Sequence, residues 1–289
     1  MEIGNCHIDC ERTLNQQERN KLVDLAQPFV PNLFSSINDN WKIFVGHSDK
    51  PFINEDFFKT NIEVKSKENS FNSLALLSGV YSSIVRERNN IFTLHSSAIS
   101  KNNNAVVFVG ESFSGKSTLA ILAAKEFGFK VLSLNNTCIA FNDQVQIVGG
   151  STLITVRSSI KEIIKDEQPI SFSTDNFSLI KSDMLKDNDF SINKTNIIAI
   201  FFLAPWGKSL QVKSIDANSL TINLFFHLSR LPRTSVIFSD ENFISKIWDN
   251  EEFSNRRYKA IKENASKIQS FLITGNPHDI LTHIKSNLF

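Results

Sequence analysis

The clearest hydrophobic pattern of the chain lies between residues 105 and 127. Residues 105–109 form an unbroken apolar run of strand length, which predicts a buried strand. After a polar segment, apolar residues recur at the spacing of one helical face, and Gly128 would end that helix. These apolar residues are Leu119, Leu122, Ala123 and Phe127. The pattern therefore predicts a strand, a loop and a helix in that order.

The same criteria predict the elements on either side. Residues 91–100 have the composition of a strand and residues 101–104 that of a turn, so a hairpin would lead into the buried strand. Residues 137–148 predict a second hairpin around Asn142-Asp143, which Gly149-Gly150 would break. Further strands are expected at 130–134, 153–157, 197–203, 211–215 and 271–273, and helices at 159–165, 220–228, 241–248, 252–270 and 277–284. The strand at 197–203 is apolar throughout, which predicts a central position.

Residues 1–90 predict a smaller region of helices and strands. Helices are expected at 13–26 and 71–88, and strands at 41–45 and 62–65. The second helix would lead into the core. A chain of 289 residues can form one large domain or two smaller ones. We therefore expect a small α+β N-terminal region at 1–90 and an α/β domain at 91–289.

Composition and charge narrow the class of protein. A hydrophobic content of 41% and a charged content of 21% are ordinary for a soluble globular protein. A net charge of +1 and the lack of a strongly basic stretch argue against nucleic-acid binding. The N-terminus does not have the pattern of a signal peptide, and the longest apolar run, 197–206, is too short to span a bilayer. We expect a cytoplasmic protein that binds neither nucleic acid nor membrane.

The three cysteines do not predict a disulfide framework. Cys6 and Cys10 flank His7, which could suggest a metal site, but no second ligand pair has matching spacing. Free thiols in a reducing compartment are the favoured interpretation of Cys6, Cys10 and Cys138.

The polar segment between the predicted strand and helix carries a phosphate-binding pattern. It fits G-x-x-x-x-G-K-[ST], and a strand before it and a helix after it are the context that this pattern requires. Backbone N–H groups would hold phosphate oxygens, Lys116 would reach the terminal phosphates, and Ser117 would ligate Mg²⁺. The alternative is a glycine turn that binds nothing. The predicted binding residues are Gly110, Glu111, Ser112, Phe113, Ser114, Gly115, Lys116, Ser117 and Thr118.

With these elements in place, the chain resembles the HPr kinase/phosphorylase family and its smaller relatives. The matching segments are 94–98, 110–118, 127–133, Gly149-Gly150 followed by Arg157, and 198–203. The resemblance implies an α/β fold with a P-loop core of the HPr-kinase/phosphoenolpyruvate-carboxykinase-like type. It also implies transfer of the γ-phosphate of ATP or GTP, with Mg²⁺, to a Ser or Thr hydroxyl of a protein or peptide. It places His95 near the phosphates and Arg157 as a phosphate clamp, although a satisfied strand histidine and a surface arginine remain open interpretations.

The sequence departs from this family where the family carries paired aspartates. Leu134-Asn135-Asn136 stands there, and an amide oxygen can ligate a cation but cannot accept the proton of a substrate hydroxyl. Phe113 stands where the family loop often has glycine, and its side chain would crowd the backbone near the phosphates. The nearest acids after the loop helix that could replace the aspartates are Asp143, Asp166 and Glu167.

Two main interpretations of function follow. In the first, the protein is an ATP-dependent kinase with His95, Asn135, Asn136 and Arg157 around the phosphates. In the second, it is a catalytically weakened or inactive ATP-binding partner subunit, which the asparagine pair favours. A third interpretation is a nucleotide hydrolase with no protein substrate. The acceptor, the choice of ATP or GTP, the general base and the formation of a homo-oligomer are left open by the sequence.

Overall fold

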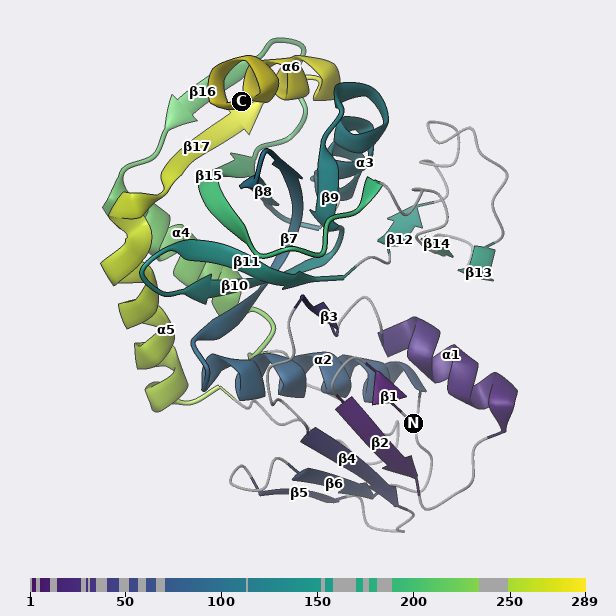
Figure 1. Cartoon of the computed structure of the whole chain (residues 1–289). Helices are drawn as coiled ribbons and strands as arrows, with labels where there is room; N and C mark the ends of the chain where they lie inside the picture. The colour runs from purple at the N-terminus through teal and green to yellow at the C-terminus, as the bar shows by residue number, and fades with distance from the viewer. Residues whose placement is uncertain are drawn as a thin grey trace.

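A mixed β-sheet runs through the centre of the described part of the chain, and helices cover both of its faces (Figure 1). The computed structural model describes residues 2–3, 6–10, 15–26, 30, 32–34, 41–46, 52–56, 61–65, 71–112, 114–151, 154–157, 170–173, 177–180, 189–233 and 249–289. Within 2–10, 41–77 and 154–180 the description covers the backbone only. The architecture is mixed α/β, as the sequence predicts.

The central sheet combines parallel and antiparallel strands. In spatial order they are β16 (Gln211–Ser214), β17 (Gln269–Thr274), β15 (Thr195–Leu203), β8 (Asn104–Val109), β7 (Ile91–Lys101), β10 (Asn136–Phe141), β11 (Val145–Gly150) and β3 (Asn32–Leu33), and β9 (Lys130–Ser133) pairs with β7 beside this order. β8, β15 and β17 run parallel to one another, whereas β7 is antiparallel to β8, β9 and β10. β15 therefore lies inside the sheet, which confirms its predicted central position.

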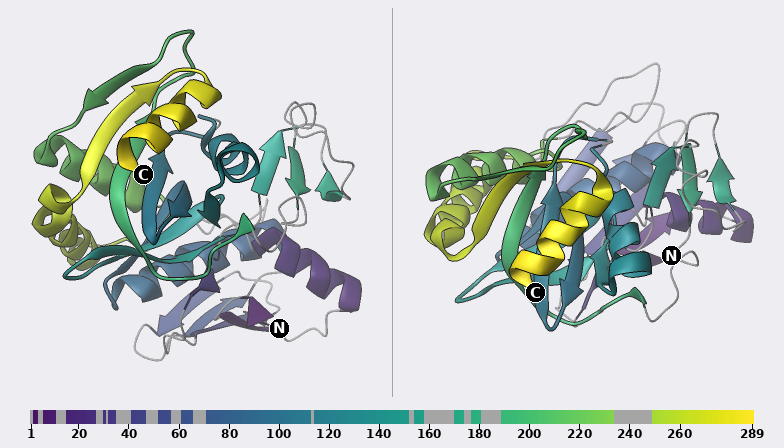
Figure 2. Two further views of the ribbon diagram at one scale, coloured as in Figure 1. Left: turned by 45° about the horizontal axis from the view of Figure 1, so that its top comes forward. Right: turned by 90° about the horizontal axis from the view of Figure 1, so that it is seen from above.

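Side-chain alternation along β8 explains why both faces of the sheet are covered. Val106 and Phe108 pack in one cluster with α3 (Lys116–Phe127) and α6 (Pro277–Leu288). Val107 and Val109 belong to the cluster on the other face, with α4 (Ala217–Ser229) and α5 (Glu251–Asn264). A strand buried between two helical layers needs apolar residues that point to both faces, and β8 supplies them from Ala105 to Val109. Figure 2 shows the helices on the two faces of the sheet.

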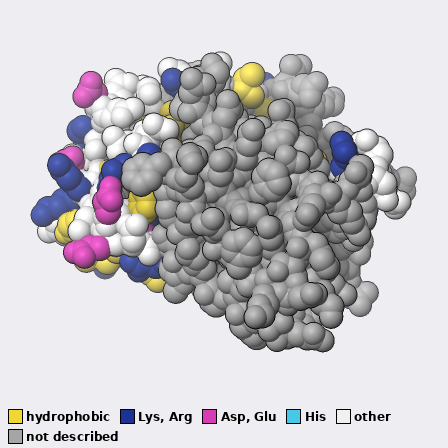
Figure 3. All heavy atoms as spheres, turned by 90° about the horizontal axis from the view of Figure 1, so that it is seen from below, with side chains coloured by type: hydrophobic (Ala, Val, Ile, Leu, Met, Phe, Trp, Pro, Cys, Tyr) yellow, Lys and Arg dark blue, Asp and Glu magenta, His cyan; other side chains and the backbone are white. Residues whose placement is uncertain are grey.

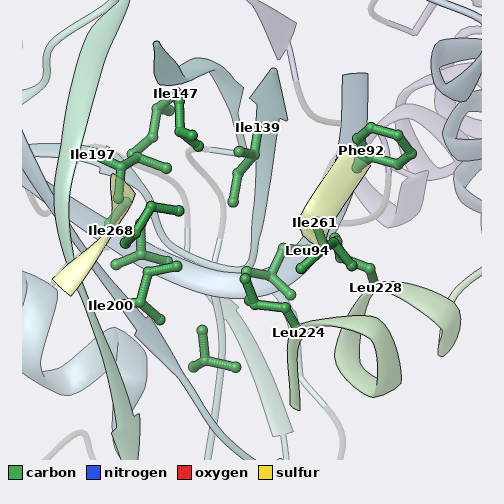
Figure 4. Packing of buried hydrophobic residues seen from close by; sticks show 14 of the residues in the cluster. Phe92, Leu94, Ile139, Ile147, Ile197, Ile200, Leu224, Leu228, Ile261 and Ile268 are labelled. Atoms are coloured by element: carbon green, nitrogen blue, oxygen red, sulfur yellow. The ribbon is translucent and has the colours of Figure 1, made fainter. Parts of the chain in front are cut away.

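The second of these clusters connects the sheet with the helix that reaches the candidate site. Figure 4 shows Leu224 and Leu228 of α4 beside Leu94 of β7, with Ile200 of β15 nearby. All four side chains are at most 1% exposed. Burial of an aliphatic side chain of this size stabilises a fold by about 1.5–3 kcal/mol, so α4 is held firmly against the sheet.

The hairpin that leads to the loop follows from its turn residues. β7 and β8 are joined through Asn102 and Asn103, whose φ angles of 51° and 61° lie in the left-handed region that asparagine tolerates. This predicted hairpin is confirmed, and so is the hairpin of β10 and β11. The helix at the loop ends as predicted, because Gly128 takes a φ of 73° at its C-terminus. The predicted helices at 13–26, 71–88, 220–228 and 277–284 correspond to α1 (Gln16–Ala26), α2 (Phe71–Glu87), α4 and α6.

The N-terminal part of the chain forms a second sheet. Its strands in spatial order are β1 (Glu2–Ile3), β2 (Cys6–Cys10), β4 (Trp41–Gly46), β6 (Asn61–Lys65) and β5 (Phe52–Asp56). The helices α1 and α2 pack against each other, and α2 also contacts β7 and α5. From the same part of the chain, β3 pairs with β11 of the central sheet. Residues 1–90 thus contribute both a sheet of their own and a strand of the central one.

Two sequence predictions are wrong in their boundaries. β11 continues through Gly149-Gly150, where a Cβ would lie 2.5 Å from the carbonyl oxygen of Asn32 and 2.1 Å from that of Leu132, respectively. The glycines are needed because other backbones approach closely, and both belong to the strand, which ends at Gly150 and not before Gly149. The helix expected at 252–270 ends at Asn264, and a short 3₁₀ turn separates it from β17. The helices expected at 159–165 and 241–248 lie outside the described residues.

Three further observations concern membrane spanning, surface charge and the cysteines. Among the described residues, no helix is both long and apolar enough to cross a bilayer. On the face shown in Figure 3, the described side chains include basic and acidic groups close together. Cys138, the cysteine whose side chain the structure describes, is buried and forms no disulfide.

Candidate functional site

The loop that carries the predicted phosphate pattern follows the carboxyl end of β8, an inner strand of the central sheet, and leads into α3. Gly115 precedes α3 with a φ of 89°, a left-handed conformation that glycine adopts without steric cost. Gly110 is required for space, because a Cβ there would lie 2.7 Å from Ser114 Oγ and 3.2 Å from the carbonyl oxygen of Leu203. The loop is therefore folded tightly against the ends of β8 and β15.

The N-terminus of α3 differs from those of the later described helices. The side chains of Asp216, Asn250 and Asn276 cap α4, α5 and α6 by accepting hydrogen bonds from first-turn N–H groups. Gly115, at the corresponding position of α3, has no side chain to do so. The first N–H groups of a helix have no partner within the helix, and the helix dipole adds positive potential there. The start of α3 is therefore suited to an anion.

Lys116 is folded back onto the loop. Its Nζ donates hydrogen bonds to the carbonyl oxygens of Gly110 at 3.0 Å and Glu111 at 2.8 Å. The side chain is only 5% exposed. Burial, and next the positive charge of Arg230, lower the pKa of Lys116 to about 8, against the opposing effect of Glu111. The ammonium is thus incompletely compensated in this state and would be stabilised by a further negative charge.

Ser117, the predicted metal ligand, lies among neutral oxygen atoms. Its Oγ donates to the carbonyl oxygen of Leu134 at 2.6 Å, and Ser97 Oγ donates to the same oxygen at 2.8 Å. No group of three or more His, Cys, Asp or Glu side chains in the described part of the chain could hold a metal ion. A neutral hydroxyl can ligate Mg²⁺ when the phosphate oxygens of a bound nucleotide supply the negative charge. Ser117 would therefore bind Mg²⁺ together with a nucleotide and not alone.

Asn135 and Asn136 directly follow Leu134, whose carbonyl oxygen accepts the hydrogen bonds of Ser97 and Ser117. The preceding strand, β9, pairs with β7. Asn135 is half-buried, and its carbonyl oxygen accepts a hydrogen bond from the N–H of Ser96 at 3.1 Å. Asn136 is 4% exposed, begins β10 opposite His95, and donates its N–H to Ser151 Oγ at 2.9 Å. Asn135 is therefore the asparagine that a ligand can reach more easily.

His95 is neutral at pH 7 and coupled to the loop. Burial lowers its pKa to about 4, the charges of Lys116, Arg230 and His227 act in the same direction, and a hydrogen bond with the backbone of Asn135 opposes them. A neutral imidazole can donate or accept one hydrogen bond but brings no charge to a phosphate. His95 is therefore close enough to the cationic groups of the loop to be affected by their charge. Because it is neutral, it can orient a bound phosphate by a hydrogen bond but cannot neutralise its charge.

Two residues at the site, Arg230 and His227, are missed by the sequence analysis. Arg230 follows α4, and its Nη1 lies 2.8 Å from Glu111 Oε2 in the loop. His227 belongs to the last turn of α4, and the charges of Glu111, Arg230 and Lys116 all act on it. One signal was available, because these two polar residues stand three apart at the end of an apolar helix. Nothing in the sequence indicates that this end of the helix reaches the loop.

An aromatic side chain also lies against the loop. Trp206, in the turn after β15, is close enough to Gly115 that a Cβ on this glycine would lie 2.4 Å from the indole Cζ2. The indole is 44% exposed. Gly115 therefore accommodates both the left-handed turn and the tryptophan.

The remaining predicted residues are Arg157, Asp143, Phe113, Asp166 and Glu167. The backbone of Arg157 belongs to β12 (Ile154–Arg157), which forms a separate sheet with β14 (Phe177–Ile180) and β13 (Ile170–Ser173), and its side chain is outside the described part. Asp143 is exposed in the turn beyond Phe141, and Phe141 is already about 16 Å along β10 from Asn136. It is therefore too distant to replace the missing aspartates. Phe113, Asp166 and Glu167 lie outside the described residues.

Comparisons with known proteins do not assign an activity to the chain. No protein-family model matches the sequence, and no curated protein matches it. Among solved structures, the chain is similar to the HPr(Ser) kinase/phosphatase from Coxiella burnetii, with 12% identity over 67% of this chain and 91% of that one and a TM-score of 0.30. A likeness at that TM-score supports no conclusion about activity. The function has to be inferred from the site itself.

Proposed function

We propose that the chain binds the phosphates of a nucleoside triphosphate, ATP or GTP, at residues 110–118, and that it is an HPr-kinase-like protein. The observation that carries this proposal is the unbalanced positive charge at the loop. Among the described residues, Glu111 is the carboxylate that pairs with Arg230 and acts on Lys116, and its effect does not offset burial and Arg230, which lower the pKa of Lys116 to about 8. The two nearby histidines are neutral at pH 7 because their pKa values are lowered to about 4. An excess of cations beside an uncapped helix N-terminus is suited to a polyphosphate.

The individual contacts support the same ligand. Lys116 Nζ bonds only to neutral carbonyl oxygens of its own loop, in the hydrogen bonds described above, and phosphate oxygens are stronger acceptors for an ammonium. Bound Mg²⁺ would neutralise charge on the β- and γ-phosphates, with Ser117 as its protein ligand. The Ser117 hydroxyl can accept a metal while it donates to Leu134, because an oxygen that donates one hydrogen bond keeps its lone pairs.

We further propose that the bound nucleotide serves phosphotransfer to a Ser or Thr hydroxyl of a protein or peptide. In this reaction the hydroxyl oxygen attacks the γ-phosphorus, the bond to the β–γ bridging oxygen breaks, and the nucleoside diphosphate leaves. Catalysis of this kind depends mostly on positioning and on charge stabilisation, which Lys116 and Arg230 can supply. The hydroxyl proton needs an acceptor, and His95 is a weak one because its pKa is lowered to about 4.

One observation favours a second candidate, a catalytically weakened or inactive nucleotide-binding partner subunit. The segment beside Ser117 offers the carbonyl of Leu134 and the amide of Asn135, and neither can take a proton from a hydroxyl. Glu111, the acid whose charge acts on Lys116, is already paired with Arg230. Both candidates require nucleotide binding and differ only in turnover.

Removal of the Lys116 ammonium tests nucleotide binding. We expect Lys116→Ala to weaken ATP affinity at least tenfold, which corresponds to about 1.4 kcal/mol, because the only side-chain cation of the loop is lost. Isothermal calorimetry with ATP and with GTP measures the effect. Lys125→Ala, which removes an exposed lysine from the other end of α3, is the control and should keep the parent affinity. Equal affinities of Lys116→Ala and parent would refute phosphate binding at this loop.

A carboxylate at position 135 tests whether the protein turns over. If the chain is a weakened kinase, Asn135→Asp should raise phosphotransfer or ATP hydrolysis, since general-base assistance is worth ~10²–10⁴-fold. Asn136→Asp is the matched comparison. It should raise the rate less, because residue 136 is buried at the start of β10 and a substrate hydroxyl cannot reach it. Radiolabelled ATP with co-encoded peptides measures the rate. If Asn135→Asp changes only the Mg²⁺ dependence of binding, the partner-subunit function is correct.

A further inference from the structure

An ion pair joins the end of α4 to the loop across a long stretch of sequence. Arg230 Nη1 lies 2.8 Å from Glu111 Oε2, and the two residues are 119 positions apart. The side chains are 36% and 68% exposed, respectively. Exposed pairs of this kind contribute little to stability, so a stronger partner for Arg230 can replace Glu111 easily.

A buried histidine beside this pair has an unused nitrogen. His227 is 8% exposed, and its Nδ1 has no hydrogen-bond partner in the described structure. Its ring lies between the rings of Phe202 and Phe226, with centroid distances of 5.9 and 5.3 Å. An unsatisfied polar atom in such a position is unfavourable, and a hydrogen bond to a ligand would remove that penalty.

We propose that Arg230, with His227 beside it, binds the terminal phosphate of the nucleotide, and that Glu111 holds Arg230 in place until the triphosphate enters. This inference rests on the proposed nucleotide binding and adds a specificity to it. The start of α3 and Lys116 contact the phosphates from the side of the loop, whereas Arg230 comes from the helical layer on the other face of the sheet. A diphosphate lacks the group that would reach Arg230. The protein therefore distinguishes triphosphate from diphosphate through this arginine.

The chemistry of the two partners explains the exchange. A guanidinium can bind a phosphate through two parallel hydrogen bonds, and the terminal phosphate carries more negative charge than the Glu111 carboxylate. When Arg230 moves to the phosphate, Glu111 becomes free to turn to solvent, since it is already the more exposed partner. Replacement of Arg230 by lysine would keep the charge and lose the two-bond geometry.

Calorimetry with a non-hydrolysable ATP analogue and with ADP tests this proposal. We expect Arg230→Met to weaken binding of the analogue about tenfold and to change ADP affinity less than about twofold, since a charge-assisted hydrogen bond is lost only with the triphosphate. Arg230→Lys should recover part of the loss. Glu111→Gln should raise affinity for the analogue about threefold, and should have no such effect when combined with Arg230→Met. Lys259→Met, which removes the same charge from an exposed position of α5, should leave both affinities unchanged.

The outcomes distinguish this inference from the proposed function. Equal losses for the analogue and ADP in Arg230→Met, or no loss for either, would overturn the role of Arg230 while nucleotide binding stands. Absence of nucleotide binding by the parent protein would overturn both proposals. A urea titration of each variant checks that the folded fraction is the same in all measurements.

Discussion

Two clusters of charged residues lie on either side of the end of α4, and they differ in how completely they are paired. At one, Arg257 of α5 is enclosed by Glu87 of α2 and Asp249, with side chains 0%, 1% and 4% exposed. At the other, Arg230 and Lys116 share the exposed Glu111. Adjacent residues of α4 belong to different clusters, because Ser229 accepts a hydrogen bond from Arg257 and Arg230 bonds to the loop.

The cluster around Arg257 is saturated. Nε and Nη2 bond to the two oxygens of Glu87 at 3.1 and 3.0 Å, Nη2 and Nη1 to Asp249 at 2.9 and 3.4 Å, and Nη1 to Ser229 at 2.7 Å. All the N–H donors of the guanidinium are therefore used. Arg233 adds a second cation at Asp249, with 2.7 Å between Arg233 Nε and Asp249 Oδ2.

The contrast indicates which cluster serves the fold and which is suited to a ligand. The saturated cluster has no guanidinium donor left for a ligand, and it ties α2, α4 and α5 together. In the described part of the chain, the loop cluster combines the exposed Arg230–Glu111 pair with Lys116 and a histidine nitrogen that has no hydrogen-bond partner, which suits the proposed binding of an anion. The first cluster also holds the end of α4 from which Arg230 extends.

The largest expected effect is on stability, at Arg257. We expect Arg257→Met to lower the free energy of unfolding by about 3–5 kcal/mol, because Glu87 and Asp249 would remain buried without their partner. Burial raises the pKa of Glu87 and Arg257 lowers it, so removal of the arginine leaves the desolvation of this carboxyl unopposed. Urea denaturation measures the loss.

The neighbouring arginine of the same helix is the control. Arg256 pairs with the exposed Glu252 and donates long hydrogen bonds of 3.5 and 3.4 Å to the carbonyl oxygens of Glu87 and Arg88, so Arg256→Met should cost clearly less than Arg257→Met. Adding Glu87→Gln to Arg257→Met should restore part of the stability, because it removes one unpaired carboxylate. A loss below about 1 kcal/mol for Arg257→Met would contradict the structural role of this cluster.

A smaller effect is expected on the pH dependence of nucleotide affinity. The pKa of Lys116 in the free protein is lowered to about 8, so Lys116 is charged at pH 7 and mostly neutral at pH 9. Triphosphate binding requires the charged form, and affinity should therefore fall about tenfold from pH 7 to pH 9. Lys116→Arg, which stays charged over this range, should remove most of the fall. A parent affinity that is constant from pH 7 to pH 9 would show that Lys116 keeps an ordinary pKa or does not contact the ligand.

The smallest expected effect is the stability change of Arg230→Met. Since the Arg230–Glu111 pair is exposed, its loss should change the free energy of unfolding by less than about 1 kcal/mol. The same chemical change, arginine to methionine, thus has opposite consequences at positions 257 and 230, large for stability at one and large for triphosphate affinity at the other. Similar stability losses at both positions would remove the distinction between the clusters.

The sequence predicted features that depend on local chemistry. Asn102 and Asn103 form a turn in many contexts, and Gly128 ends a helix because its left-handed conformation is local. The strand before residues 110–115 and the helix after them were predicted for the same reason, since their apolar spacing is local. The end of the strand at Gly149-Gly150 was predicted wrongly. These glycines are required because the backbones of β3 and β9, which are distant in sequence, approach them closely.

The rest of the site depends on packing between distant segments. Arg230 and Glu111 are 119 positions apart, and Arg257 and Glu87 are 170 apart. α4 is apolar around most of its circumference, and its periodicity does not indicate which residue faces the loop. The histidine and arginine at its end could be assigned only once the helix was seen against the sheet.

The position of Trp206 gives the protein an optical reporter. Its indole lies against Gly115 and is partly open to water, so its emission depends on what surrounds the loop. A phosphate or metal that enters there changes this environment, and the intensity or wavelength of tryptophan fluorescence should follow. Trp206→Phe retains the background from Trp41 and Trp248 and should lose the response. Ligands can therefore be screened against the unlabelled chain in a cuvette.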